Sequence, residues 1–245
     1  MPNILEAACA CNIGLIRKNN EDNFLFNNYF LEERNNGLED ILELSSDLSK
    51  PLSFGVFDGM GGELAGETAS YIAAKIFSEN ETKNLSDICK IANDEVCSFS
   101  KEYGIKSMGS TVAVLRVTKE FLSFVNLGDT KIYHWDGSLK QVSVDHTDAE
   151  LVQGLNIKRK PCLTQHLGIF PEDFVIEPYT DVTEAKSGDK FIICSDGLTD
   201  MVDINTIERI VKIEESPKAC IKSLMNLALR NGGRDNITII SLFLY

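Results

Sequence analysis

Short apolar runs and two helical stripes follow one another along the chain, and their order predicts its elements. Runs rich in β-branched and aromatic residues predict strands at 24–30 and 52–57. Apolar residues three or four positions apart predict one helix over 62–80 and a second from Ser86, as its N-cap, to Tyr103. Four more short strands are predicted between the second helix and residue 145: STVAVLRV, FLSFVNLG, KIYHW and LKQVSV.

The remainder of the chain mixes both kinds of pattern. Ser216 and Pro217 suit the N-cap and the first position of a helix that runs to Arg230. The other expected features are an irregular segment at 145–175, a strand at KFIICS, a short helix at 207–212 and a closing strand at NITIISLFLY.

The order of these elements predicts the class of fold. Links of hairpin length between the middle strands require antiparallel pairing. Helices grouped in blocks favour an α+β layered protein over a doubly wound parallel sheet. No break in composition marks a boundary, so we expect one domain over residues 1–245. The acidic stretch 32–50 is expected to be a solvated surface loop or short helix.

Composition narrows the partners and the compartment. The chain carries 24 Lys and Arg against 37 Asp and Glu, a formal net charge of −13. This balance argues against nucleic acid or an anionic membrane as the main partner, because both favour net positive charge. Seven scattered cysteines without a C-x-x-C, together with only three histidines, argue against zinc and fit a reducing compartment. We expect a soluble, cytoplasmic monomer without a signal peptide or membrane span.

Three Asp-Gly pairs raise the question of chemistry. Such a pair is usually a turn, and Asp136-Gly137 has the pattern of a two-residue hairpin. Asp58 and Asp196 differ, because each ends a strand and leads toward a helix. Asp22 and Asp235 stand at comparable strand edges, and Asp129 lies between two strands.

Carboxylates that meet at one rim of a sheet repel each other and raise each other's pKa. Divalent cations such as Mg²⁺ and Mn²⁺ remove that conflict because they prefer oxygen ligands. Two such ions bridged by one carboxylate also lower the pKa of a shared water. A nucleotide cradle is poorly supported, since GMGGEL is not G-x-G-x-x-G and no G-K-[ST] follows.

Eight stretches give the chain a resemblance to the metal-dependent serine/threonine protein phosphatases (the PPM, or type two-C, family), above all to the bacterial branch. They occur in the family's order and cover nearly the whole chain. They are GLIRKNNEDNF (14–24), FGVFDGMGGELAGE (54–67), GSTVAVL (109–115), NLGDTKIY (126–133), DHT (145–147), LTQHLG (163–168), FIICSDGLTD (191–200) and GGRDNITII (232–240).

The resemblance implies an α-β-β-α sandwich of two antiparallel sheets covered by helices, with a metal cleft at one edge. It also implies a role for each matching residue. Asp58 resembles the carboxylate that bridges two ions, Gly59 the residue whose carbonyl binds one of them, and Asp196 and Asp235 the other carboxylates of the first ion. Asp22 resembles the residue that orients metal-bound water, Asp129 with Asp196 resembles a third, weaker metal site, and Arg17 resembles the arginine that grips the substrate phosphate.

The implied activity is hydrolysis of phosphoserine and phosphothreonine on proteins by a hydroxide that bridges two Mn²⁺ or Mg²⁺ ions. The enzyme would oppose a serine/threonine kinase. For Arg17, phosphate contact is favoured over a plain surface arginine. Two other functions remain open: a phosphatase-like module that binds phosphoproteins without turnover, and a hydrolase of small phosphates. The retained carboxylates favour the active enzyme.

Several positions depart from the family's pattern. Met60 stands where many eukaryotic members have a histidine, and Gln165 replaces a frequent arginine. The flap, here around 145–175, is shorter than usual. For His166, which lies in it, a packed or solvated side chain is favoured over contact with substrate.

Overall fold

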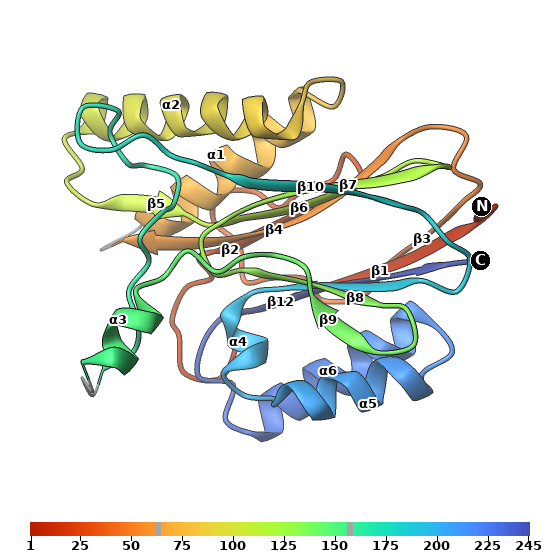
Figure 1. Cartoon of the computed structure of the whole chain (residues 1–245). Helices are drawn as coiled ribbons and strands as arrows, with labels where there is room; N and C mark the ends of the chain where they lie inside the picture. Colours follow the sequence, from red (N-terminus) through yellow and green to blue (C-terminus); the bar gives the residue numbers. More distant parts are fainter. Residues whose placement is uncertain (62–64, 156–158) are drawn as a thin grey trace.

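Two antiparallel sheets face each other in the computed structural model, which describes residues 1–61, 65–155 and 159–245 (Figure 1). Sheet A has the strand order β3-β1-β12-β11-β8-β9, and sheet B has the order β10-β7-β6-β4-β2, with β5 paired to β4. The strands of sheet A are β1 (Leu5–Asn12), β3 (Leu42–Ser46), β8 (Lys131–Trp135), β9 (Leu139–Gln141), β11 (Lys190–Cys194) and β12 (Ile237–Leu244). Those of sheet B are β2 (Asp22–Phe26), β4 (Leu52–Gly61), β5 (Met108–Ser110), β6 (Val112–Val117), β7 (Phe121–Leu127) and β10 (Tyr179–Glu184).

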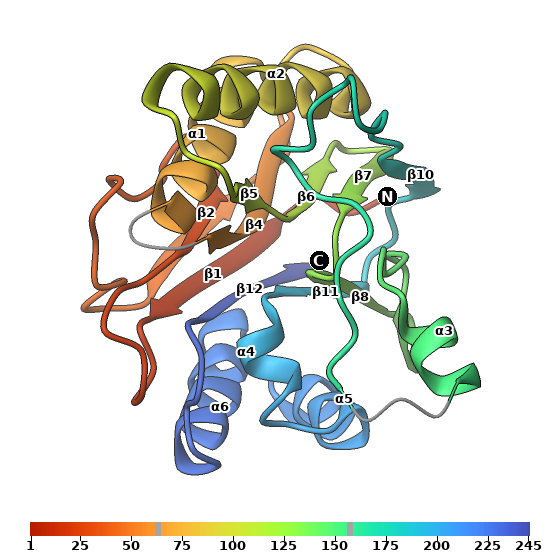
Figure 2. The same cartoon turned by 90° about the vertical axis from the view of Figure 1, so that its left-hand side faces the viewer.

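Helices cover the outer face of each sheet (Figures 1 and 2). The helices α1 (Ala65–Glu79) and α2 (Leu85–Tyr103) pack on sheet B, whereas α5 (Ile204–Ile213) and α6 (Pro217–Arg230) pack on sheet A. The short helices are α3 (Ala149–Gly154), which stands away from the layers, and α4 (Asp196–Thr199), which follows β11. The predicted four-layer α-β-β-α sandwich is confirmed. None of the described helices is long and apolar enough to cross a bilayer.

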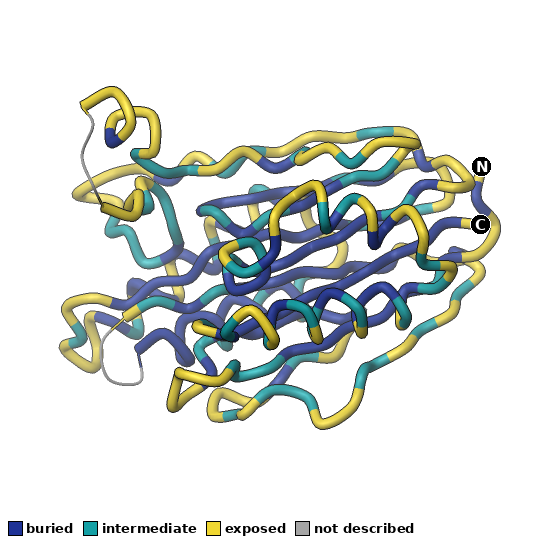
Figure 3. Tube along the Cα trace, turned by 90° about the horizontal axis from the view of Figure 1, so that it is seen from below, coloured by how far each residue is buried: buried dark blue, intermediate teal, exposed yellow. Residues whose placement is uncertain are grey.

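The last strand shows how one apolar run serves two layers. All eight residues of β12 are buried, as its dark path through the middle of Figure 3 shows. Ile240, Leu242 and Leu244 lie in the core between the sheets, while Ile239 and Phe243 pack against the helices on the other face. Successive side chains of a strand point to opposite faces, so a strand covered on both sides reads as continuously apolar. This position in the centre of sheet A accounts for the sequence NITIISLFLY.

The structure corrects several expectations about strands. β1 and β10 were not predicted, and β3 lies within the acidic stretch 32–50, where a loop or short helix was expected. The four middle strands do not belong to one sheet, because β6 and β7 pair in sheet B and β8 and β9 pair in sheet A. The chain therefore crosses between the sheets at residues 128–130. Asp129 is in this crossing.

The start of α2 differs from the prediction by two residues. Its N-cap is Asn84, whose side-chain oxygen accepts a hydrogen bond from the backbone N of Ser86 at 2.9 Å. Ser86 thus lies inside the helix. The predicted start of α6 is confirmed, since the hydroxyl of Ser216 accepts from the backbone N of Ala219 at 3.3 Å. The first helix is described from Ala65 on, and the predicted positions 62–64 lie outside the described residues.

The N-cap of α2 gives a stability prediction. Asn84→Ala removes the side-chain acceptor at the helix end and should lower the free energy of unfolding by about 1 kcal/mol. Ser86→Ala is the matched control, and it should change the free energy by less than about 0.5 kcal/mol. Urea denaturation followed by circular dichroism measures both. A larger loss in the Ser86 variant would contradict the capping assignment.

Candidate functional site

The register of sheet A brings three acidic segments to the same end. Cys194, the last residue of β11, lies opposite Lys131 at the start of β8 and opposite Ile239 near the start of β12. Because these strands are antiparallel neighbours, Asp129, Asp196 and Asp235 all lie within a few residues of the same end of the strands, which we call the acidic edge of the sandwich. This edge is opposite to the two chain termini in Figure 1, and Figure 2 faces it.

Sheet B brings two more carboxylates to this edge. Asp22 begins β2 and lies directly opposite Asp58 on β4. The two sheets together surround a cavity of about 320 Å³, which we call the carboxylate cavity. Its lining includes the acidic residues Asp58, Asp129, Asp196 and Asp235, the neighbouring Arg17, Glu21 and Gly59, and Met60, Thr111, Lys160 and Asn236. Six of the seven candidate site residues thus meet in one cavity, and Asp22 lies behind it.

The glycines of the Asp-Gly pairs serve two different purposes. A Cβ on Gly59 would lie 2.2 Å from the carbonyl oxygen of Gly66, and one on Gly197 would lie 1.9 Å from that of Asn236. Neither contact is sterically allowed, so these two glycines permit close approach of backbones. Gly137 instead has a φ of +116° and open space around it, which is the requirement of a tight turn. The predicted hairpin turn at Asp136-Gly137 is confirmed, but its loop has three residues, 136–138, and not two, because Trp135 pairs with Leu139.

Thr111, which lies between β5 and β6, fixes the position of Asp58. Its hydroxyl accepts from the backbone N of Asp58 at 3.0 Å, and its own N donates to the carbonyl of Asp58 at 2.9 Å. The hydroxyl also lies 2.5 Å from that of Thr130. Burial raises the pKa of Asp58 well above its usual range, and the nearby charges of Asp22 and Asp196 raise it further.

Asp22 lies behind the carboxylate cavity. The hydroxyls of Ser195 and Thr238 donate to its carboxylate at 2.8 and 2.7 Å, and the residue is 2% exposed. Burial raises the pKa of Asp22 to about 7, although the two hydroxyls oppose the shift. The adjacent Glu21 lines the cavity instead. Burial and the charge of Glu67 raise the pKa of Glu21.

Two carboxylates of the cavity contact cationic side chains. Asp235 accepts from the guanidinium of Arg17 at 2.6 Å, and Asp196 accepts from Nζ of Lys160 at 2.6 Å. Lys160 also reaches the carboxylate of Asp200 at 2.8 Å. The side chains of Arg17 and Lys160 are 46% and 60% exposed, so solvent weakens both ion pairs. Burial still raises the pKa of Asp196.

Asn236 fastens the loop that carries Arg17. Its side-chain oxygen accepts from the backbone N of Glu21 at 2.9 Å, and its Nδ2 donates to the carbonyls of Ile13 and Asn19 at 2.9 and 3.0 Å. One buried amide therefore ties both ends of the 13–21 loop to the start of β12. This tie holds Arg17 beside Asp235.

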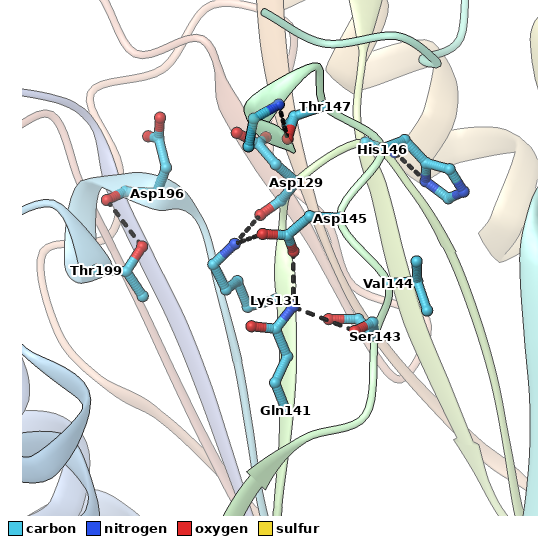
Figure 4. Close-up of polar contacts among 12 residues, drawn as sticks. Asp129, Lys131, Gln141, Ser143, Val144, Asp145, His146, Thr147, Asp196 and Thr199 are labelled. Carbon is cyan, nitrogen blue, oxygen red and sulfur yellow. Dashed lines mark hydrogen bonds and ion pairs between the residues drawn. The ribbon is translucent and has the colours of Figure 1, made fainter. Parts of the chain in front are cut away.

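Asp129 enters from the crossing between the sheets (Figure 4). Nζ of Lys131 lies between the carbonyl oxygen of Asp129, at 3.2 Å, and the carboxylate of Asp145, at 2.5 Å. Gln141 donates to the other carboxylate oxygen of Asp145 at 2.6 Å. Among the described residues, none donates a hydrogen bond to the carboxylate of Asp129. Burial, followed by the charge of Asp196, raises the pKa of Asp129.

The chemistry of this donor set fits hard divalent cations. Five carboxylates, those of the four aspartates and of Glu21, and the carbonyl of Gly59 offer oxygen ligands, as Mg²⁺ and Mn²⁺ prefer. Burial first, and repulsion between neighbouring carboxylates second, raise the pKa values of Asp58, Asp129 and Asp196, and a bound cation would offset both effects. In the described part of the chain, no three acidic, cysteine or histidine side chains already surround one point. A cation entering here would replace the side-chain partners of Asp196 and Asp235.

Comparison with known proteins agrees with the geometry. Residues 33–224 match the family model of protein phosphatase 2C. The chain belongs to the protein phosphatase 2C family. It is 31% identical to the serine/threonine protein phosphatase PstP of Mycobacterium tuberculosis over 202 residues, which are 75% of this chain and 38% of PstP. It is 28% identical to the serine/threonine phosphatase stp of Listeria welshimeri over 208 residues, 76% of this chain and 81% of stp.

A solved structure extends this likeness over the ends of the chain. The catalytic domain of PstP, in complex with two manganese ions, has a TM-score of 0.77 at 25% identity and covers 98% of each chain. The match to the family model leaves out Arg17, Glu21 and Asp235. In the folded chain, Arg17, Glu21 and Asp235 nevertheless line the carboxylate cavity. By sequence, the chain spans well under half the length of PstP.

Sequence reasoning did not single out Glu21, Thr111, Lys160 or Asn236. Glu21 and Asn236 each stand beside a residue that was chosen. Only the structure shows that Glu21 lines the cavity whereas Asp22 does not, and that Asn236 lines it together with Asp235. Thr111 is an uncharged residue between two strands, and nothing in the local sequence distinguishes it from other threonines. Lys160 had no usable signal, because it lies in the irregular segment and reaches Asp196 across 36 positions.

The amide of Asn236 gives a prediction for the site's rigidity. Asn236→Ala leaves three backbone groups without their partner and should lower the free energy of unfolding by about 3 kcal/mol. Asn231→Ala, in the preceding loop, removes one exposed hydrogen bond to Met201 and should cost less than about 1 kcal/mol. Thermal and urea unfolding of both variants would test this difference. Equal losses would mean that Asn236 is not the tie described above.

Proposed function

We propose that this chain is a metal-dependent protein phosphatase that hydrolyses phosphoserine and phosphothreonine on proteins. The observation that carries the proposal is the carboxylate cavity, where Asp58, Asp196 and Asp235 meet beside Arg17. Membership of the protein phosphatase 2C family and the names of PstP and stp support it. Residues 1–245 would form a single phosphatase domain, and 145–175 would form its short flap.

The cations would be Mn²⁺ or Mg²⁺. Asp58 would bridge two of them, with Gly59 contributing its carbonyl and Asp196 and Asp235 completing the first site. Asp129 and Asp196 would form a third, weaker site. When bound, the ions would lower the pKa of a coordinated water and neutralise phosphate charge. The two manganese ions of the PstP structure support the first two sites.

The chain's own residues would bind and orient the substrate. Arg17 offers a planar guanidinium, which can hold two phosphate oxygens at once. Its side chain lines the cavity and is half-exposed, so an incoming phosphate can reach it. Asn236 and Thr111 keep Arg17 and Asp58 in place. Asp22, which lies opposite Asp58 on the neighbouring strand, would orient the coordinated water. In phosphoryl transfer, positioning and charge stabilisation supply most of the catalysis.

The cytoplasm is the proposed compartment. All seven cysteines are unpaired, and six of them are buried. Reduced thiols persist in a reducing environment, which supports this location. The substrates there would be phosphoproteins made by a serine/threonine kinase.

Activity measurements test the proposal directly. The purified protein should hydrolyse an aryl phosphate and a phosphothreonine peptide with added Mn²⁺, and a chelator should abolish both reactions. Asp196→Asn should reduce kcat by more than about a hundredfold while the fold is retained. The matched control is Asp136→Asn in the hairpin Asp-Gly pair, which should retain full activity. Phosphopeptide binding without turnover in the wild type would favour the non-catalytic module instead.

Lys160 gives a prediction about cation affinity. The ammonium of Lys160 forms an ion pair with the carboxylate of Asp196. Lys160→Met should therefore let this carboxylate bind a cation without first losing a partner. The dissociation constant for Mn²⁺ should fall by about three- to fivefold, since an exposed ion pair is worth up to about 1 kcal/mol. Isothermal titration calorimetry measures it without turnover. Lys140→Met, which breaks the exposed pair with Asp136, is the control. Weaker Mn²⁺ binding in the Lys160 variant would show that the ammonium does not compete with the ion.

A further inference from the structure

His146, in the stretch DHT (145–147), contacts the crossing that carries Asp129 (Figure 4). Two hydrogen bonds join it to Gly128, which directly precedes Asp129. The backbone N of His146 donates to the carbonyl of Gly128 at 3.0 Å, and the backbone N of Gly128 donates to Nδ1 of the imidazole at 3.1 Å. The contact therefore depends on the side chain of residue 146 as well as on its backbone.

The second of these bonds determines the state of the imidazole. A backbone N–H only donates, so Nδ1 offers a lone pair and the neutral ring keeps its proton on Nε2. Burial lowers the pKa of His146, which favours the neutral ring. An acceptor is needed at this place, because Gly128 is buried and its N–H has no other hydrogen-bond partner in the described part of the chain.

The placement of Asp129 depends on its two neighbours. No hydrogen bond from the described residues reaches its carboxylate, so the backbone on either side has to place it. On one side, the hydroxyl of Thr130 lies 2.5 Å from that of Thr111. On the other side, Gly128 has a φ of +102°, and a Cβ there would lie 2.7 Å from Cγ2 of Thr111. Residue 128 is thus a glycine without a side chain of its own to anchor it, and the bonds from His146 provide the anchor.

His146 is itself held by its neighbours. Its carbonyl accepts from the backbone N of Thr164 at 2.8 Å, on the other arm of the 145–175 segment. Val144, two residues earlier, exchanges two hydrogen bonds with the side-chain amide of Asn126, at 2.7 and 3.0 Å. The imidazole therefore approaches Gly128 from a backbone that is fixed on both sides. A ring supported in this way can position its partner precisely.

We propose that His146 is a positioning residue, which holds Asp129 in the place where the third, weaker cation would bind. This inference rests on the proposed function, since it takes Asp129 and Asp196 as the ligands of that cation. His146 does not line the carboxylate cavity, so it would act through the backbone of Gly128. Replacing a group that orients a metal ligand typically weakens metal binding or activity by about ten- to a hundredfold.

Calorimetric titration with Mn²⁺ alone tests this role, because the measurement needs neither substrate nor turnover. The wild type should bind two cations and a third more weakly. Asp129→Asn should remove the third binding step and leave the first two. This variant identifies the step that depends on the carboxylate of Asp129, so that the effect of His146 can be read on that step.

Two substitutions of His146 separate the acceptor from the ring. His146→Phe keeps a ring but lacks the acceptor, so the dissociation constant of the third cation should rise by about tenfold. The first two constants should stay within about twofold of the wild type, because their ligands do not depend on Gly128. His146→Asn offers Oδ1 in place of Nδ1 and should restore most of the affinity for the third cation.

Two controls distinguish positioning from a general loss of structure. His134→Phe replaces another partly buried histidine, on β8, whose ring stacks on Phe191, and it should leave the affinity for the third cation unchanged. His146→Phe added to Asp129→Asn should weaken Mn²⁺ binding no further, because the carboxylate that His146 positions is already replaced. Circular dichroism checks that each variant keeps its fold.

Several results would overturn the inference. Unchanged affinity for the third cation in His146→Phe, or an equal loss in His146→Asn, would exclude the role of the acceptor. Equal weakening of all three cations, or a further loss in the double variant, would assign the effect to the fold in general. A wild type that binds two cations and no third would overturn this inference alone. A wild type that binds no Mn²⁺ and hydrolyses no phosphopeptide would overturn the proposed function as well.

Discussion

The crowding of carboxylates at one edge of two sheets is the constraint on which the site depends. Burial raises the pKa of Asp58, Asp129 and Asp196, and the charges of neighbouring aspartates raise each of them further. A fold without a use for this arrangement would gain stability by replacing them, because like charges in a desolvated space oppose folding. The molecule instead pairs Asp196 with the exposed Lys160 and the neighbouring Asp235 with the exposed Arg17, and it gives the buried Asp22 two hydroxyl donors. This partial neutralisation keeps the acidic edge compatible with a folded chain, and the proposed cations would complete it.

Close approach of backbones is what lets these groups meet. At Gly59 and Gly197 the chain passes so near to Gly66 and Asn236 that no side chain fits. Each aspartate is thereby placed on a segment that neighbouring segments hold from several sides. Asn236 adds the third connection by tying the 13–21 loop to β12. The positions of the carboxylates follow from packed backbone, so a flexible loop does not have to order itself when a ligand arrives.

Much of this arrangement could be predicted from the sequence, and the failures have physical reasons. The Asp-Gly pairs at 58 and 196 stood out because an apolar run before a carboxylate is a local signal. β1 was missed since its alanines and cysteines have little strand preference, although pairing with β12 and β3 makes it a strand. The assignment of strands to sheets depends on contacts between distant residues, and no local pattern shows that the chain crosses at Asp129. The sequence likewise does not show that Glu21 lines the cavity while Asp22 lies behind it, because a shift of one residue exchanges the faces of a strand.

The two ion pairs suggest how the proposed enzyme would link cation uptake to phosphate binding. The carboxylate of Asp235 cannot bind a cation and keep its full ion pair with Arg17, and this exposed pair contributes little stability. A cation that takes Asp235 would therefore release the guanidinium at small cost, in the place where the phosphate arrives. The phosphate then becomes the better partner, since it offers Arg17 two oxygens and full negative charge. Asn236 holds the loop through both steps, so the exchange needs only a side-chain movement. The same reasoning applies to Asp196 and Lys160. Lys160 belongs to the 145–175 segment, so a cation that displaces it from Asp196 would also break this contact between the segment and the cavity.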